Sequence, residues 1–200
     1  MRVLLATRNP GKISDFRDML SGTGITLVSC LDYDLPSPDE TEEDLAGNAL
    51  IKARAAFSAV GIPTISDDSG FFVHHLDGWP GVRTADLAET PGGRDWASVR
   101  SLIWSRLEEC KAGYPRTASF ASAVALILPG GSEKVFQEEV RGEVVWPPRG
   151  DLGYDLDPIF RPEGERRTFG QMSVKEKNAH NSRSWAFVRL MPSLLAHFGA

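Results

Sequence analysis

Strand patterns and helix patterns alternate along the first third of the chain, and this alternation restricts the fold more than any other feature of the sequence. Arg2 to Ala6 reads as a buried strand, and the helical pattern after it carries apolar residues on one face between Ile13 and Leu20. A second short strand is predicted at Ile25 to Val28, followed by an acidic, proline-containing loop from Asp32 to Glu40. The chain is therefore expected to begin as a strand, a helix and a second strand.

A longer helix and a third strand are predicted next. Thr41 can cap a helix whose first turn, Glu42 to Asp44, is acidic, and whose alanine-rich body runs to about Val60. Pro63 ends any helix there, and Thr64 to Ser66 begins another strand.

Two long strands dominate the second half of the chain. Trp96 to Cys110 has helical spacing, Thr117 to Leu128 is the longest strand candidate, and Val135 to Val145 is its expected antiparallel neighbour. A helical pattern near the end is expected to be interrupted by Pro192. Early alternation followed by a strand pair predicts an α/β fold with a long mixed central sheet flanked by helices.

Size and charge limit the class of protein. With 200 residues, of which 42% are hydrophobic, we expect residues 1–200 to form a single bilobed domain with a sizeable core. A net charge of -5 argues against nucleic acid as a partner. The apolar run from Val3 to Ala6 is too short for a signal peptide or a membrane span, which predicts a cytoplasmic protein with no membrane partner.

Cysteine and histidine spacing does not indicate a metal or redox site. Cys30 and Cys110 are far apart and lack paired spacing, so both are interpreted as ordinary thiols. The four histidines show no metal-ligand motif, and surface or structural roles are expected for them.

A polar turn from Thr7 to Lys12 separates the first strand from the first helix. Such a turn can present backbone N–H groups and a helix N-terminus to an anion, and Lys12 adds a positive charge suited to phosphate. The turn lacks the spacing of a P-loop, and an ordinary strand-to-helix connection would look similar.

A second polar group surrounds the alanine-rich helix. Glu40 precedes this helix, and Asn48 and Lys52 are four residues apart and therefore share one of its faces. A solvated helix face would show the same pattern.

The run Ser66-Asp67-Asp68-Ser69-Gly70 places two adjacent carboxylates after a strand. Successive strand residues point to opposite faces, so Asp67 and Asp68 can reach one ligand only if the chain turns, and Gly70 is interpreted as allowing that turn. Carboxylate oxygens suit Mg²⁺, which proteins hold through one or two carboxylates together with substrate phosphates. A turn whose side chains bond their own backbone remains the alternative.

Positive charge is also concentrated near the end of the chain. On one continuous helix Lys177 and Arg183 would be about 240° apart and could not easily serve one ligand. Asn181 can cap a new helix that begins at Ser182, which would place Arg183 in a first turn and let both cations reach one anion. A solvated basic helix would look similar.

Taken in order, five segments of the chain resemble the inosine triphosphate pyrophosphatase family. Nearly the whole chain is covered by segments that are similar to the family's motifs: LLATRNPGK, ETEEDLAGNALIKA, SDDSGFFVHHLDGWPGV, RGEVVWPPRGDLGYDLDPIF and MSVKEKNAHNSR. If these segments were only ordinary turns and solvated surfaces, five unrelated explanations would have to coincide in this order, which favours the resemblance.

The resemblance implies a two-lobed α/β fold around an active-site cleft, bound Mg²⁺, a purine nucleoside triphosphate substrate and usually a homodimer. It implies cleavage of inosine, deoxyinosine and xanthosine triphosphates to the monophosphate and pyrophosphate. By analogy, the metal ligands are Glu40 and Asp68, and the catalytic residues are Asp68, Asp67 and Lys52. The substrate-binding residues that match are Thr7, Asn9 and Lys12 for the triphosphate, Ser69 beside the nucleotide, and Gly153, Tyr154, Asp155, Lys177, Ser182 and Arg183 around the base.

Three departures from the family pattern concern the metal site and the base pocket. Gly47 stands where the family has a glutamate that helps to order the metal site. Leu152 replaces a phenylalanine, and Leu156-Asp157 lengthens the loop before Pro158. Ser182 replaces a histidine near the base. We therefore expect weaker discrimination between inosine and adenine triphosphates than in the family, with Asp157 as a new acceptor for an exocyclic amino group.

Two alternatives stay open at this point. The chain could be a related pyrophosphatase for a modified pyrimidine or a standard deoxypurine nucleotide. It could also be a nucleotide-binding regulator that has lost catalysis, which Gly47 would favour.

Overall fold

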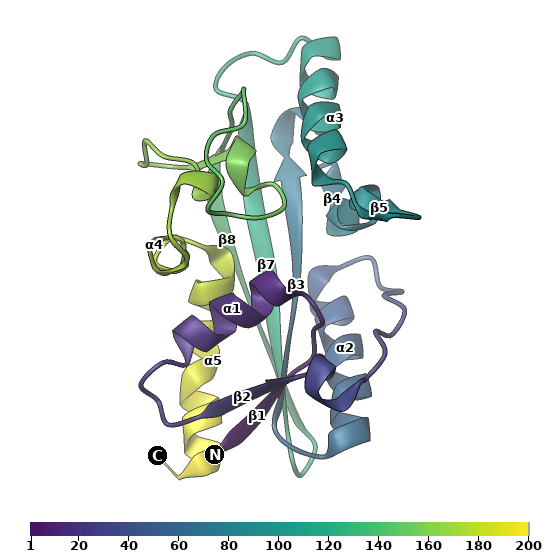
Figure 1. Cartoon of the computed structure of the whole chain (residues 1–200), viewed down its shortest axis with the longest axis vertical. Helices are drawn as coiled ribbons and strands as arrows, with labels where there is room; N and C mark the ends of the chain where they lie inside the picture. The colour runs from purple at the N-terminus through teal and green to yellow at the C-terminus, as the bar shows by residue number, and fades with distance from the viewer. Residues whose placement is uncertain (200) are drawn as a thin grey trace. The chain divides into compact units, whose positions relative to one another are not determined.

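In the computed structural model, which describes residues 1–199, helices flank a mixed β-sheet (Figure 1). The strands are β1 (Arg2–Leu5), β2 (Thr26–Ser29), β3 (Thr64–Val73), β4 (Pro80–Gly81), β5 (Glu89–Thr90), β6 (Gly93–Arg94), β7 (Thr117–Leu128), β8 (Ser132–Val144) and β9 (Phe160–Pro162). The α-helices are α1 (Pro10–Met19), α2 (Leu45–Val60), α3 (Trp96–Glu109), α4 (Val174–Asn178) and α5 (Ser182–Phe198). The predicted α/β class is confirmed, and no helix within residues 1–199 is long and apolar enough to cross a membrane.

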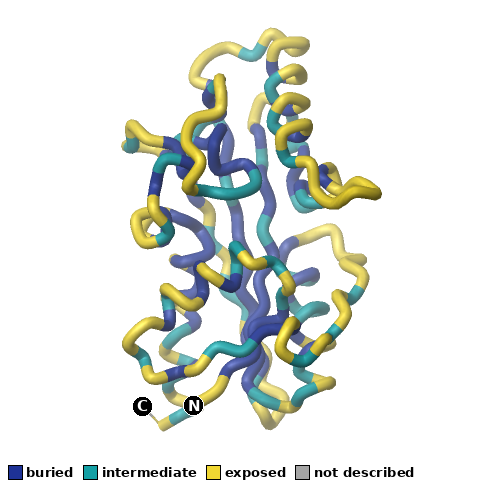
Figure 2. Tube along the Cα trace, in the orientation of Figure 1, coloured by how far each residue is buried: buried dark blue, intermediate teal, exposed yellow. Residues whose placement is uncertain are grey.

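The main sheet combines parallel and antiparallel pairs. Its strand order is β2-β1-β3-β7-β8-β9, and β4 also pairs with β3. β1 runs parallel to both β2 and β3, whereas β3 with β4 and β8 with β9 are antiparallel. Buried residues concentrate in β1, β3 and β7 (Figure 2), as expected for strands covered by helices.

The chain divides into two compact units. The first comprises residues 1–69, residues 122–138 and the chain from Ser182 onward, and the second comprises residues 70–121 and 139–181. β3, β7 and β8 contribute residues to both units.

In the first unit, helices cover both faces of the sheet. Val3 and Leu5 of β1 belong to an apolar cluster with α1 and α5, in which the Phe16 and Phe187 rings meet edge to face at 5.3 Å. Leu4 alternates with them and packs with Ala56 of α2 in a separate cluster. β1 is therefore buried on both sides, and Figure 1 shows α2 and α5 on opposite sides of it.

The second unit has its own apolar core. Phe71 of β3 and Phe160 of β9 meet edge to face at 5.7 Å, and Val99, Ile103 and Leu107 bury one face of α3 in the same cluster. These three residues lie four apart, which explains why the helical spacing of this segment was readable from the sequence.

The start of α2 differs from the sequence prediction. The helix begins at Leu45, not after Thr41, and Asp44 is its cap, with the carboxylate accepting a hydrogen bond from the Gly47 N–H. The residues just before α2 are held by the Asn48 side-chain amide. It accepts a hydrogen bond from the Glu42 N–H and donates one to the Glu42 carbonyl. This closed pair of bonds fixes the chain as a loop ahead of the helix.

β3 does not turn at Gly70, contrary to the sequence interpretation. The strand continues from Thr64 to Val73, and Gly70 meets a different requirement. A Cβ atom at this position would lie 2.6 Å from the Gly81 carbonyl oxygen and 2.9 Å from the Phe72 ring. Glycine is needed here because β4 approaches closely.

The end of the chain is helical from Ser182, as predicted, but Pro192 does not end the helix. α4 stops at Asn178 and α5 runs from Ser182 to Phe198 with Pro192 inside it. The buried residues Leu190 and Leu194 anchor the helix on both sides of the proline. Burial of this apolar face outweighs the one backbone hydrogen bond that the proline removes.

Gly70→Ala should destabilise the protein by about 2 kcal/mol or more, because the added methyl group overlaps backbone atoms that cannot move cheaply. Gly113→Ala is the matched control, since its Cβ would meet nothing within 4 Å, and it should change stability by about 1 kcal/mol or less. Urea unfolding of both variants measures the difference, and equal stabilities would contradict the close approach of β4.

Candidate functional site

Alternation along β3 sends its polar side chains to two different faces of the sheet. Ile65 packs in the cluster with α1 and α5, and Asp67 and Ser69 follow it on the same face. Ser66 and Asp68 point the other way, and the Ser66 hydroxyl donates to the Ala49 carbonyl of α2. The two adjacent carboxylates therefore serve two separate groups of side chains.

On the face covered by α2, Lys52 joins two carboxylates. Its Nζ atom lies 2.7 Å from Asp68 Oδ1 and 3.2 Å from Glu40 Oε1. The side chains of Lys52 and Asp68 are only 11% and 8% exposed, whereas that of Glu40 is 43% exposed. The three residues form the predicted grouping, with Glu40 at its solvent side.

The charges on this face shift each other's protonation. Burial raises the pKa of Asp68, and the Glu40 carboxylate adds to this effect, while Lys52 and Lys12 partly oppose it. Burial acts on Lys52 in the opposite sense, but the Asp68 and Glu40 carboxylates outweigh it and raise the Lys52 pKa. Asp68 is thus a carboxylate with a stronger affinity for protons than an exposed aspartate.

Asp68 also fits one requirement of a metal ligand. Its Oδ2 atom is buried and makes no hydrogen bond among residues 1–199, although buried carboxylate oxygens usually have partners. Glu40 and Asp68 converge on one point, the Lys52 ammonium, so two hard oxygen ligands are close together. The described residues contain no cluster of three or more potential metal-binding side chains, so a hard cation here would need further oxygen ligands from substrate or water.

Gly47 is explained by its neighbour Glu42. A Cβ atom at position 47 would lie 2.6 Å from Glu42 Cγ and 2.7 Å from Glu42 Cβ. The Glu42 side chain therefore occupies the space that a larger residue at position 47 would need.

On the face covered by α1 and α5, Asp67 is surrounded by cations. Its Oδ2 atom lies 3.0 Å from Lys12 Nζ and 2.9 Å from Arg183 Nε. Arg183 Nη1 in turn contacts Asp15 Oδ2 of α1 at 2.6 Å. Asp15, Asp67 and Arg183 are each more than 90% buried, so the group is an ionic network inside the protein.

This network keeps Asp67 ionised. Burial alone would raise its pKa, but Lys12, Arg183 and Lys52 outweigh burial and hold the Asp67 pKa well below 3.8. Burial lowers the pKa of Lys12, and the attraction of Asp67 offsets only part of that effect. The carboxylate is an acceptor only, and its cationic partners are donors only.

The Thr7–Lys12 turn is organised around Asn9. The Asn9 side chain caps α1 by accepting from the Gly11 and Lys12 N–H groups at 2.8 and 3.4 Å. Thr7 Oγ1 accepts from the Asn9 N–H at 3.2 Å. The turn therefore holds Lys12 at the start of α1, where its side chain reaches Asp67.

Three serines extend the same face. Ser69 Oγ lies 2.9 Å from Ser122 Oγ of β7, which lies 2.9 Å from Ser182 Oγ at the start of α5. Ser69 also contacts Asp67 and Arg183. Ser182, expected beside the base, has its hydroxyl buried in this serine cluster.

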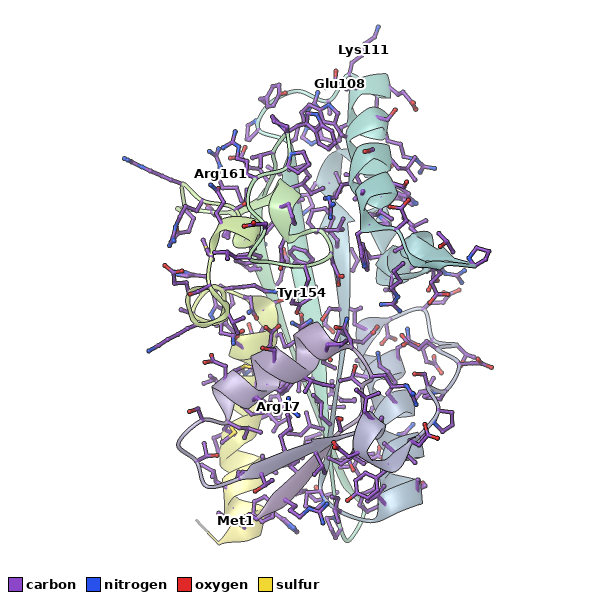
Figure 3. The ribbon with its side chains drawn as sticks, viewed as in Figure 1. Met1, Arg17, Glu108, Lys111, Tyr154 and Arg161 are labelled. Atoms are coloured by element: carbon purple, nitrogen blue, oxygen red, sulfur yellow. The ribbon has the colours of Figure 1, made fainter. Side chains whose placement is uncertain are left out.

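The second unit holds the remaining predicted residues around Asp157. Asp157 Oδ2 accepts from Lys177 Nζ and from the Tyr154 N–H, each at 2.9 Å, and Lys177 Nζ lies 3.7 Å from the centre of the Tyr154 ring. Tyr154 is labelled in Figure 3 and is half-buried. A Cβ atom on Gly153 would lie 2.6 Å from Asp157, so this glycine is required by the packing of that carboxylate.

The sequence prediction for this loop needs a correction. Asp157 was expected to offer an open acceptor, but its carboxylate is 95% buried and is engaged by Lys177 and Tyr154. Asp155 has a left-handed φ of 53°, and its carbonyl oxygen accepts from Arg100 Nη1 at 2.7 Å. Lys177 is thus paired with the carboxylate of Asp157, which lies directly before Pro158.

Sequence reasoning grouped some residues correctly and missed others. The predicted grouping of Glu40, Asp68 and Lys52 is observed. The contacts of Asp67 with Lys12 and Arg183 were not predicted. Lys177 and Arg183 belong to different units and contact Asp157 and Asp67, respectively.

Asp15, Ser122 and the pairing of Asp157 were missed. Only Asp15 had a readable signal, because it lies three residues after Lys12 and so shares its helix face.

Comparisons with known proteins were consistent with one another. Residues 3–193 match the sequence model of the Ham1 family. A dITP/XTP pyrophosphatase from Ruegeria pomeroyi is 43% identical over 184 residues, which cover 92% of this chain and 90% of that protein. A second dITP/XTP pyrophosphatase, from Caulobacter vibrioides, is 42% identical and covers 96% of this chain and 97% of its own length. The structure of a HAM1 protein from Coxiella burnetii superposes with a TM-score of 0.85 at 28% identity and covers 98% of this chain and 99% of that one.

Asp67→Asn should lower the free energy of unfolding by about 3 kcal/mol, because it leaves the buried Arg183 and the half-buried Lys12 without their shared negative charge. Glu133→Gln is a suitable control, since Glu133 pairs with Arg54 near the surface and its loss should cost about 1 kcal/mol or less. Denaturant titration compares the two, and similar losses would argue against a buried ionic network.

Proposed function

This chain belongs to the Ham1 family, and we propose that it is a nucleoside triphosphate pyrophosphatase acting on inosine, deoxyinosine and xanthosine triphosphates. The family predicted from the sequence motifs is confirmed. The dITP/XTP pyrophosphatases to which the chain is similar span nearly its whole length, which supports the same reaction class here. The observation that carries the proposal is the convergence of Glu40 and Asp68 on Lys52, together with the buried Asp68 Oδ2 atom, which makes no hydrogen bond among residues 1–199.

The proposed reaction is attack of water on the α-phosphorus of the triphosphate, which releases pyrophosphate and leaves the monophosphate. Such chemistry depends mainly on alignment and on neutralising the charge of the phosphates. Mg²⁺ would be held by Glu40 and Asp68 and, when bound, would offset part of the phosphate charge. Lys12 and Lys52 supply positive charge from the protein.

We assign to Asp68 the role of the base that takes a proton from the attacking water. Burial raises its pKa, so it holds a proton from water better than an exposed carboxylate does. Asp67 helps from the opposite face of β3 by fixing Lys12 and Arg183. The two aspartates therefore have different functions, although they are adjacent in the sequence.

Two groups of residues are assigned to the triphosphate and to the base of the nucleotide. We propose that Thr7, Asn9 and Lys12 bind the triphosphate and that Ser69 lies beside the nucleotide. The base would be contacted by Gly153, Tyr154, Asp155, Lys177 and Arg183. A 6-oxo purine presents an acceptor at O6, and the Lys177 ammonium is a donor suited to that edge.

The family resemblance also supports proposals for the oligomeric state, cellular location, cofactor and domain organisation of the enzyme. We propose a homodimer located in the cytoplasm, with Mg²⁺ as the cofactor and the chain as a single bilobed domain. A change of base preference remains an alternative, because Leu156 and Asp157 reshape the loop. A nucleotide-binding regulator without catalysis is the second alternative, favoured by Gly47.

Pyrophosphate release across a panel of nucleoside triphosphates tests the reaction class directly. We expect turnover of inosine, deoxyinosine and xanthosine triphosphates that requires Mg²⁺ and is lost when the metal is chelated. Adenine and guanine triphosphates should be slower by less than about a thousandfold, because the histidine that the family has near the base is absent at position 182. Binding of nucleotides without pyrophosphate release at saturating Mg²⁺ would favour the regulator instead.

Asp68→Asn should leave less than about a tenth of wild-type turnover, equivalent to a loss of at least about 1.4 kcal/mol in transition-state stabilisation. The substitution removes the charge assigned to the metal and the water but keeps the shape of the side chain. Arg54→Gln serves as a control on the exposed face of α2, and it should keep full activity. An active Asp68→Asn enzyme would exclude Asp68 as the base.

A further inference from the structure

The three serines on the α1 and α5 face form a continuous chain of hydroxyl groups that ends on a charge. Ser122 and Ser182 are 3% and 2% exposed, and Ser69 is half-buried. They come from three elements far apart in the sequence, β7, α5 and β3. Ser122 shares its strand face with Val124 and Leu126, which pack against α1 and α5, so its hydroxyl must point toward the ionic network.

The charges of Asp67 and Arg183 determine the direction of every hydrogen bond between the three serine hydroxyls. Asp67 contacts the cations Lys12 and Arg183, so it is ionised and only accepts, and Ser69 must donate to it. Arg183 only donates, so its Nη2 atom, 3.3 Å from Ser69 Oγ, uses one lone pair of that oxygen. Since the single Ser69 proton is already committed, Ser122 must donate to Ser69.

The same reasoning continues one step further. Once Ser122 has donated its proton to Ser69, it can only accept from Ser182, so Ser182 donates to Ser122. Each hydroxyl dipole then directs its positive end along the chain toward Asp67. Hydrogen bonds aligned in this way polarise one another in a buried environment.

We propose that Ser122 and Ser182 are positioning residues that act through Ser69 to hold Asp67 and Arg183 in place for the reaction. In this arrangement Asp67 Oδ2 receives Lys12, Arg183 and Ser69 together, which fixes the carboxylate and the two cations relative to one another. Ser182 then affects the reaction with every nucleotide equally and is not a base-reading residue. This inference rests on the proposed function, because the group being positioned is assigned to triphosphate cleavage.

The test compares Ser182→Ala, Ser122→Ala and the double variant, with Ser119→Ala as the matched control. Ser119 is a buried serine on the same strand, and its alternation with Ser122 places it on the other face. Ser182→Ala and Ser122→Ala should each lower kcat for inosine triphosphate by about 3- to 10-fold. Ser119→Ala should change kcat by less than about twofold. The double variant should fall little further than the lower single variant, because either substitution breaks the same chain.

Base preference separates positioning from base recognition. Ser182→Ala should change the ratio of inosine to adenine triphosphate turnover by less than about twofold, as should Ser122→Ala. A large change of this ratio in Ser182→Ala alone would overturn the inference and assign Ser182 to the base. Effects of the two serines that multiply in the double variant would overturn it as well.

Urea unfolding of the same variants provides a measurement that does not depend on activity. The losses of stability from Ser122→Ala and Ser182→Ala should be non-additive, as expected for directly bonded groups. A wild type that releases no pyrophosphate from any triphosphate would overturn the proposed function. An active wild type whose serine variants are additive in both activity and unfolding would overturn only the hydroxyl chain.

Discussion

The two-residue period of β3 is the constraint on which the candidate site depends. Because consecutive side chains leave a strand on opposite faces, Asp67 and Asp68 cannot share one environment while the strand stays regular. Each carboxylate instead meets a lysine from the helix that covers its own face, Lys12 from α1 and Lys52 from α2. A single buried strand thus builds two electrostatically distinct sites from neighbouring residues.

Burying these carboxylates is possible only because cations are buried with them. Asp67 is compensated by two cations and becomes strongly acidic, whereas Asp68 meets one lysine that it shares with Glu40 and becomes less acidic than usual. The contrast assigns a permanent charge to one face and a proton-binding carboxylate to the other. In the second unit, the buried charges of Asp157 and Lys177 likewise neutralise each other.

Small residues determine how closely these groups can approach. Gly70 admits the Gly81 carbonyl of β4, and Gly153 admits the Asp157 carboxylate. Gly47 leaves room for the stem of Glu42. In none of the three does a positive φ explain the glycine; each is explained by the space that its missing side chain leaves to a neighbour.

The sequence by itself determined the α/β class, the bounds of β7, the extent of α3 and the new helix at Ser182, because these depend on periodicity and capping within short segments. It also grouped Lys52 with Glu40, because Glu40 precedes the helix on which Lys52 and Asn48 share one face. Only the tertiary structure decided that β3 runs straight past Gly70 and that Asp157 pairs with Lys177. The same holds for Asp15 and Ser122, since which helix covers which face of a sheet, and therefore which side chains meet, is set by packing between segments that are distant in the chain.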